Sequence, residues 1–470
     1  MPALSSNGPY RTLDLGDGTT APWYMLPFDK RGRCTAPQAR AALLTEVKSG
    51  DYSDVIVFSH GWNNDWATAT GRYEHFIDGY AKMRRDRELP TPDGFRPLLV
   101  GIFWPSTALI LPWERAPRIA ATARAQQDAE TDQENRAIEE LAALVEEPDL
   151  EEFYTLTRNP RPLTEAEARR LAEIMLPLYR DATHADRDFD PPDPSSDDLE
   201  PQEIVEVWRA AARAESGGTD VDDDGYSLDP DHDDPVDPAS APMAAGFPGF
   251  LDPRQIVRLM TVYQMKDRAG VVGTRGVGPL LDEVLELQRT NGRSHLHLIG
   301  HSYGGKVMLS AISATRSEKP VTSLLLVQPA VNGWCFAADV AGRGYPGGYR
   351  PVLARVSHPI LTTYSRHDVP LTRFFHLAVR RRSDLGELRI AGAGQPTPPS
   401  KYAALGGFGP SGLSDDECSF IPIPAAGADF PFSVTKEVYA LDSREAISGH
   451  GDISVPASWW ALYSLLTHNR

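Results

Sequence analysis

The sequence predicts an α/β fold in which a mostly parallel central sheet is flanked by helices. Two observations support this prediction. The run at residues 55–58 is short, continuously apolar and β-branched, as expected of a strand that helices bury on both faces. Comparable runs at 97–106, 294–302, 321–330 and 358–368 alternate with helical stretches over much of the chain, and that alternation indicates a parallel sheet.

The remaining core elements follow in chain order. Residues 10–15 and 21–28 flank a Gly-Asp-Gly turn and predict an antiparallel hairpin, and residues 39–47 predict a helix. The apolar spacing of 253–265 and 278–287 fits helices packed on the sheet, and residues 437–443 and 459–468 predict the last strand and the terminal helix. We interpret the Pro- and Gly-rich segment at about 391–430 as an insertion or a long loop.

The strand pattern stops between residues 107 and 250, which predicts a large helical insertion. Residues 116–147 and 203–214 have helical composition, and Thr164 with Glu167 forms a capping-box pattern. Two Pro- and Asp-rich segments, 188–198 and 218–238, are expected to be mobile or ordered only by a ligand. The chain therefore divides into an N-terminal part of the core at 1–106, a helical and acidic cap at 107–250, and a C-terminal part of the core at 251–470.

The negative charge of the chain is local. The formal net charge is −18, and residues 181–240 alone contain 20 Asp or Glu against 3 Arg, a balance of −17. The remainder is close to neutral, so neither nucleic-acid binding nor adsorption to an anionic membrane has electrostatic support. The acidic segment leaves a basic protein partner as one open interpretation.

The cysteines and the N-terminus predict a location. Cys34, Cys335 and Cys418 are too few and too widely spaced for a disulfide framework or a zinc knuckle, and they suit a reducing compartment. The N-terminus lacks a secretory signal, and no apolar run is long enough for a transmembrane segment. We expect a soluble cytoplasmic protein, with export that reads no such signal as the open alternative.

The strongest chemical signal is a G-x-S-x-G pattern formed by Gly300, Ser302 and Gly304. A predicted strand precedes it and a predicted helix follows it. A serine that attacks a carbonyl must project from a strained turn between a strand and a helix, and small neighbours let adjacent backbones approach that turn. Ser302 is therefore the candidate nucleophile.

A serine nucleophile needs a base, and the base needs a carboxylate that orients it. Asp368 ends a predicted strand that would deliver it to the same edge of the sheet as Ser302, whereas the preceding strand offers Asn332 instead of an acid. His450 lies between the last predicted strand and the terminal helix, flanked by glycines. It is the predicted base, with His367 and His376 as rivals. The order Ser, acid, His suits this fold.

The oxyanion of a tetrahedral intermediate needs backbone N–H donors. The residue after the nucleophile, Tyr303, supplies one. The second is expected from the loop after the strand at 55–58, where Trp62 follows His60 and Gly61.

These motifs resemble the α/β-hydrolase superfamily, and within it bacterial serine esterase and lipase-like hydrolases. The resemblance rests on SHGW at 59–62, FWPS at 103–106 and GHSYGG at 300–305, and it covers about residues 10–106 and 250–465. It implies an α/β-hydrolase fold and hydrolysis through an acyl-enzyme. The long insertion departs from the pattern and lies where many lipases and esterases have a lid.

The predicted activity is cleavage of a carboxylic ester, with a small-molecule or a lipid ester as substrate. Two alternatives stay open. The same triad could cleave an amide, a peptide or a thioester, because fold and nucleophile do not determine the leaving group. The chain could also be a binding or scaffold module that retains a hydrolase core.

No cofactor is expected, although one acidic pattern imitates a calcium loop. Asp220, Asp222 and Asp224 alternate ahead of a glycine, with Asp231 at the twelfth position. The twelfth residue is Asp instead of Glu and no exit helix follows, so a solvated acidic run is the favoured interpretation.

Overall fold

A computed structural model describes residues 8–15, 18–92, 94–106, 134–185, 200–216, 251–291, 294–342, 344–357, 359–375, 403–433 and 437–468. These residues form a nine-stranded sheet in the order β1-β2-β4-β3-β5-β6-β7-β9-β8. Only the β1–β2 pair is antiparallel, which confirms the predicted hairpin, and every other neighbouring pair is parallel. The strands are β1 (Arg11–Asp14), β2 (Thr20–Pro27), β3 (Asp54–Ser59), β4 (Pro97–Phe103), β5 (His295–His301), β6 (Ser323–Val327), β7 (Ile360–Tyr364), β8 (Cys418–Pro422) and β9 (Val438–Asp442).

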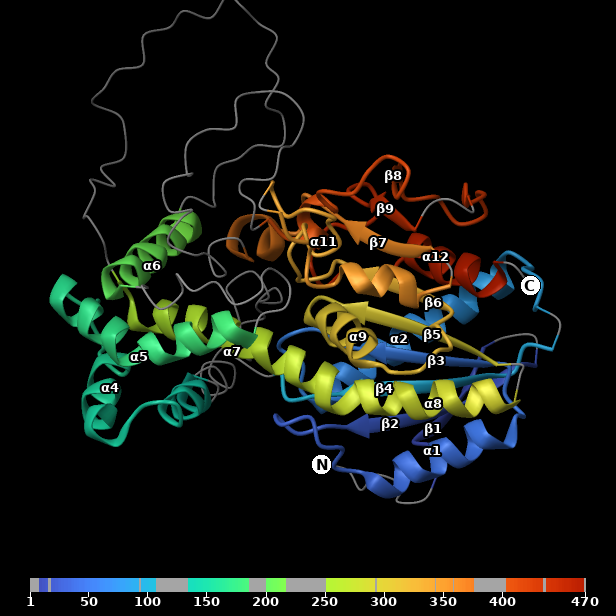
Figure 1. The fold of residues 1–470 in the computed structure, drawn as a ribbon, viewed down its shortest axis with the longest axis horizontal. Coiled ribbons are helices and arrows are strands. Elements are labelled where there is room, and N and C mark those ends of the chain that lie inside the picture. The colour runs from blue at the N-terminus through green and yellow to red at the C-terminus, as the bar shows by residue number, and fades with distance from the viewer. Residues whose placement is uncertain are drawn as a thin grey trace, which may run out of the picture.

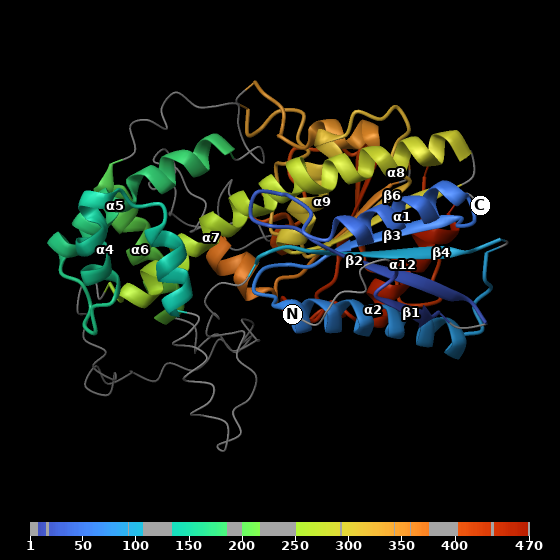
Figure 2. The ribbon, with the colours of Figure 1, turned by 90° about the horizontal axis from the view of Figure 1, so that it is seen from below.

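Helices cover both faces of this sheet, so the predicted α/β architecture is confirmed. One face packs against α1 (Pro37–Ser49), α8 (Gly278–Asn291) and α9 (Tyr303–Ala314). The other face packs against α2 (Trp66–Asp86) and α12 (Pro456–Thr467), and Figure 2 shows the two layers on opposite sides of the strands. Strands β3, β4 and β6 are buried along their whole length because each lies between two helical layers.

The described part of the insertion is helical and has a core of its own. A helix at 134–142 precedes a short 3₁₀ turn at Glu147–Asp149, and α4 (Leu150–Thr157), α5 (Glu165–Ala185) and α6 (Pro201–Ser216) follow. They pack around Phe153, Leu171 and Trp208. The predicted capping box opens α5: the Thr164 N–H donates to the Glu167 carboxylate at 2.8 Å, and the Glu167 N–H donates to the Thr164 Oγ1 at 3.3 Å.

The apolar core of this helical insertion, called the lobe below, also contains side chains from beyond residue 250. Ile256 and Met260, in the first half of α7 (Pro253–Val272), belong to the insertion core, whereas Met265 and Val272 belong to the sheet core. A π-helical turn at Gly273–Val277 links α7 to α8. The three segments form one nearly continuous helix that runs from the lobe to the sheet (Figure 1). α6 also contacts a π-helical turn at Pro370–Phe374, so the lobe lies at the carboxyl ends of the strands.

Four further elements differ from the prediction or were absent from it. Within the segment at about 391–430, which we interpreted as an insertion or a long loop, residues 418–422 form the edge strand β8, and Leu405–Phe408 form a short helix, α11. The long helix α2 and a 3₁₀ turn at Arg350–Arg355 were not predicted. Among the described helices, none combines the length and the apolar character needed to cross a bilayer.

Candidate active site

Ser302 lies in a tight turn between β5 and α9. Its backbone has φ 55° and ψ −126°, a conformation that a non-glycine residue adopts at a cost of about 1–3 kcal/mol. The turn is possible because the residues two positions before and after Ser302 are glycines. A Cβ at Gly304 would lie 2.1 Å from the Ser59 carbonyl oxygen, and a Cβ at Gly300 would lie 2.6 Å from the Gly305 Cα. The glycine pattern therefore reflects close backbone approach.

Asp368 and His450 lie at the same edge of the sheet as Ser302. Asp368 comes four residues after β7 and is fully buried, and His450 lies in the loop between β9 and α12 with 15% of its side chain exposed. His450 Nδ1 is 2.7 Å from Asp368 Oδ2, and His450 Nε2 is 2.8 Å from Ser302 Oγ. The structure thus brings the three predicted residues into one chain of hydrogen bonds.

The carboxylate determines the tautomer of the imidazole. An ionised carboxylate only accepts hydrogen bonds, so Nδ1 of His450 donates to Asp368 and Nε2 is left to accept from the Ser302 hydroxyl. Asp368 is itself held, because its Oδ1 accepts the Leu371 N–H at 3.0 Å. This arrangement can move a proton from the serine to the histidine and stabilise the imidazolium that results.

The loop after β3 lies against the nucleophile. A Cβ at Gly61 would lie 2.7 Å from the Ser302 Cβ, so only glycine lets this loop approach so closely. Trp62 follows directly, and Tyr303 is the first residue of α9, whose first-turn N–H groups point out of the helix end. The Asn64 side-chain amide donates to the carbonyls of Gly61 at 3.0 Å and Trp62 at 2.7 Å, which holds the two peptide units in place.

The imidazole of His60 connects this loop to Trp104, the residue that follows β4. Its Nδ1 donates to the Gly61 carbonyl at 2.8 Å, and its Nε2 accepts the Trp104 N–H at 3.1 Å. The Trp104 indole stacks on the imidazole and donates to the His60 carbonyl at 3.0 Å. Burial is the main reason that the pKa of His60 falls to about 4, with a smaller contribution from the cation of Arg72. His60 is therefore neutral near pH 7.

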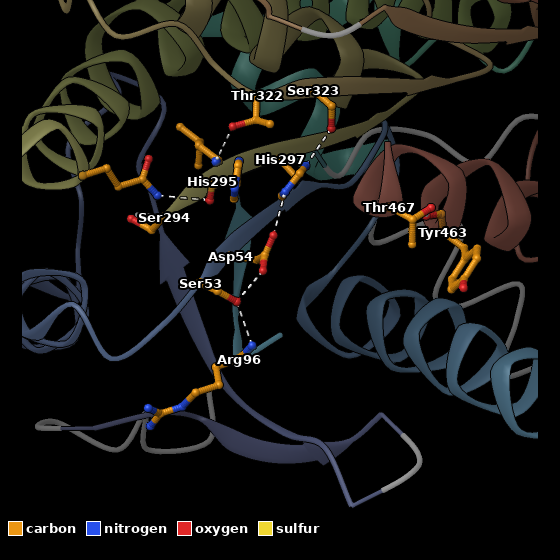
Figure 3. Close-up of polar contacts among 12 residues, drawn as sticks. Ser53, Asp54, Arg96, Ser294, His295, His297, Thr322, Ser323, Tyr463 and Thr467 are labelled. Atoms are coloured by element: carbon orange, nitrogen blue, oxygen red, sulfur yellow. Dashed lines mark hydrogen bonds and ion pairs between the residues drawn. The ribbon is translucent and has the colours of Figure 1, made fainter. Parts of the chain in front are cut away.

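A second Asp-His-Ser arrangement occupies the opposite end of the strands. His297 Nε2 lies 3.0 Å from Asp54 Oδ1 and its Nδ1 lies 2.8 Å from Ser323 Oγ, as Figure 3 shows. The exposed fractions of Asp54, His297 and Ser323 are 0%, 2% and 1%. Ser323 is the first residue of the extended strand β6 and is not presented by a strand-to-helix turn as Ser302 is. The His297 side chain is 2% exposed, against 15% for that of His450. We interpret this cluster as a structural hydrogen-bond network that connects β3, β5 and β6.

The structure describes one of the two rival histidines and the asparagine at the competing strand end. His367 is exposed, and Asn332 is buried with its Oδ1 accepting the Trp334 N–H at 2.8 Å. His376 lies outside the described residues. So does the candidate calcium loop at Asp220, Asp222, Asp224 and Asp231. Within the described ranges, no three His, Cys, Asp or Glu side chains gather in a group that could hold a metal ion.

Several supporting residues were not singled out from the sequence. His60 and Trp104 lie in the SHGW and FWPS motifs, whose joint occurrence was the available signal, but their stacking could not be foreseen. Ser106 also belongs to FWPS, and its Oγ accepts the Asn64 N–H at 3.1 Å. His301 is a further case, because it occupies a variable position of the elbow motif. Its Nε2 donates to the main-chain carbonyl of His450 at 2.8 Å.

Comparison of the chain with protein-family models, with curated proteins and with solved structures gives no match in any of the three.

Proposed function

We propose that this chain is a serine hydrolase of the α/β-hydrolase superfamily that cleaves a carboxylic ester. The observation that supports the proposal is the unbroken chain of hydrogen bonds from Asp368 through His450 to Ser302, on a serine in a strained turn. The site also lies outside the carboxyl ends of the strands. It is next to the topological switch point between the neighbouring strands β3 and β5, from which the chain continues to opposite sides of the sheet. In open α/β sheets this is the usual place for a ligand.

The reaction follows from the roles of these groups. Ser302 Oγ attacks the ester carbonyl carbon while its proton passes to His450 Nε2, and Asp368 stabilises the imidazolium. The tetrahedral oxyanion accepts hydrogen bonds from the N–H groups of Trp62 and Tyr303. The C–O bond to the alcohol then breaks, and the imidazolium gives its proton to the leaving oxygen.

The second half of the reaction repeats these steps with water. His450 takes a proton from water, the hydroxide attacks the acyl carbon on Ser302, and the carboxylic acid leaves as the serine recovers its proton. No cofactor is needed for this sequence of proton transfers.

A fluorophosphonate probe tests the proposal directly. We expect one covalent adduct on the wild-type chain, located at Ser302 by mass spectrometry of peptides, and none on the Ser302→Ala variant. Ser323→Ala is the matched control, because Ser323 belongs to the buried Asp-His-Ser cluster and its removal should leave labelling intact. A folded wild-type chain that remains unlabelled would favour a binding module over an enzyme.

Substrate class is tested with p-nitrophenyl esters of rising chain length beside matched amides and thioesters. Turnover of esters that increases with acyl length would favour a lipid ester, whereas a preference for short acyl groups would favour a small ester. Hydrolysis of amides or thioesters with inertness towards every ester would refute the ester assignment while retaining the serine mechanism.

The Asp368→Asn variant tests the proton path. An amide at this position favours the other tautomer of His450, in which Nε2 carries the proton and cannot accept from Ser302. We expect kcat to fall by about 10⁴-fold with KM nearly unchanged. Wild-type turnover by this variant would contradict the role of Asp368.

A further inference from the structure

His301 connects the candidate nucleophile to the loop that bears the candidate base. It is the residue immediately before Ser302 at the end of β5, and its side chain reaches the loop between β9 and α12. Its Nε2 lies 2.8 Å from the main-chain oxygen of His450, and the two imidazole rings are 5.1 Å apart. His301 therefore links Ser302, its neighbour in the chain, to His450, which lies 148 residues after Ser302.

The protonation of His301 is determined by this contact. A carbonyl oxygen only accepts, so Nε2 must carry the proton and donate it. The ring is 3% exposed, and burial, followed by the charge of His450, lowers the pKa of His301 well below its ordinary value. His301 is thus a neutral donor with one defined tautomer, and its role does not depend on titration near pH 7.

The other side of the ring lies against the oxyanion loop. A Cβ at Gly61 would lie 3.1 Å from His301 Nδ1, so the ring sits between Gly61 and the His450 main chain. The atom Nδ1 is buried and makes no hydrogen bond with any residue that the structure describes. Among the described residues, the imidazole of His301 therefore forms a hydrogen bond through Nε2 alone, to the main chain of His450.

The loop between β9 and α12, which carries His450, is also hydrogen-bonded to the rest of the protein at one point before His450 and one point after it. Ser365 Oγ donates to the Ile447 carbonyl at 3.0 Å, and Ser454 Oγ donates to the His75 carbonyl at 3.2 Å. Between these two points the loop is closed on itself by Asp452, whose N–H donates to the Gly449 carbonyl at 3.1 Å and whose carboxylate accepts the Ser448 hydroxyl at 2.8 Å. The His301 bond acts at the residue whose imidazole must stay within hydrogen-bond distance of Ser302.

We propose that His301 is a positioning residue, which holds the main chain of His450 so that its imidazole stays in line between Asp368 and Ser302. The inference rests on the proposed serine hydrolase function and extends it to a residue outside the triad. Loss of the bond lets the His450 main chain move while the substrate-contacting groups remain. A misplacement of about 1 Å in a reacting geometry can cost about 10²-fold in rate.

Two substitutions separate this role from a packing role. His301→Leu removes the donor and retains an apolar side chain, and His301→Gln places an amide N–H near the position of Nε2. We expect kcat of the Leu variant to fall about 10- to 100-fold with KM within about twofold, and the rate of fluorophosphonate labelling to fall in parallel. His301→Gln should recover most of both. His367→Leu, at an exposed histidine, is the matched control.

Folding is followed by circular dichroism and by the thermal midpoint, so that a folding defect is recognised. If the Leu variant does not fold, His301→Asn replaces it, because the shorter amide cannot reach the His450 carbonyl and should lose the rate that Gln recovers. Wild-type kcat and labelling in a folded Leu or Asn variant would overturn the inference. A wild-type chain that the probe does not label would instead refute the proposed function.

Discussion

Burial of His60 makes the stability of this protein depend on pH in a predictable direction. The pKa of His60 falls from 6.5 to about 4 on folding, mainly through burial. Between these two values the unfolded chain binds a proton that the folded chain does not, so stability is highest above pH 6.5 and is lost as the pH falls. Over the whole window the loss is about 3 kcal/mol, from about 1.4 kcal/mol for each pKa unit.

The part of this loss that can be measured under mild conditions is smaller. Between pH 7.5 and pH 5.5 the linkage relation gives about 1.3 kcal/mol for His60 alone. The free energy of unfolding in urea, measured at both pH values, should show at least this decrease, because the pKa of His301 is lowered in the same direction. Glutamates with low pKa values, such as Glu167 and Glu417, add to the pH dependence only below about pH 4.5.

The His60→Gln variant isolates the contribution of this residue. It removes the titrating group from both states, so its loss of stability between pH 7.5 and pH 5.5 should be smaller than that of the wild type by about 1.3 kcal/mol. Equal losses in wild type and His60→Gln, or an NMR titration of His60 with a midpoint near pH 6.5, would refute the reasoning.

Two further predictions concern the oxyanion loop and the lobe. Gly61→Ala places a Cβ within 2.7 Å of the Ser302 Cβ, so the loop must move and kcat for an ester should fall about 10²- to 10³-fold, whereas Gly71→Ala, with open space around its Cβ, should retain kcat. Arg268→Ala removes donors to the Pro105 carbonyl at 2.9 Å and to Glu140 at 2.7 Å, and it should lower the unfolding free energy by about 1–3 kcal/mol and speed proteolysis of the lobe. The exposed Arg254→Ala should cost under about 1 kcal/mol. Wild-type rates or stabilities in the first member of each pair would contradict these expectations.

Much of the site could be predicted because its signals are local. The glycines around Ser302 are needed for one turn, and a strand before it with a helix after it indicates that turn from adjacent residues alone. Asp368 and His450 follow strands that end at the same edge, so their approach to Ser302 could be inferred from chain order. The capping box of Thr164 and Glu167 was predictable for the same reason, since both partners lie within one helical turn.

The edge strand β8 shows why other elements could not be predicted. After the buried Cys418, its residues alternate between partly buried and exposed, with Phe420 55% exposed, so it lacks the continuous apolar run of an inner strand. What stabilises it is parallel pairing with β9, which comes later in the chain. Nothing within 391–430 could reveal that partner.

The sequence by itself determined the α/β alternation, the elbow at Ser302 and the identity of the acid and base candidates, because each depends on side-chain periodicity or on a short motif. Only the tertiary structure decided which histidines lie against Ser302 and how deeply the imidazole of each Asp-His-Ser set is buried. His301 meets a main-chain carbonyl 149 residues away, and such a bond leaves no pattern in the sequence. The difference in burial between His297 and His450 depends on all the elements packed around each ring.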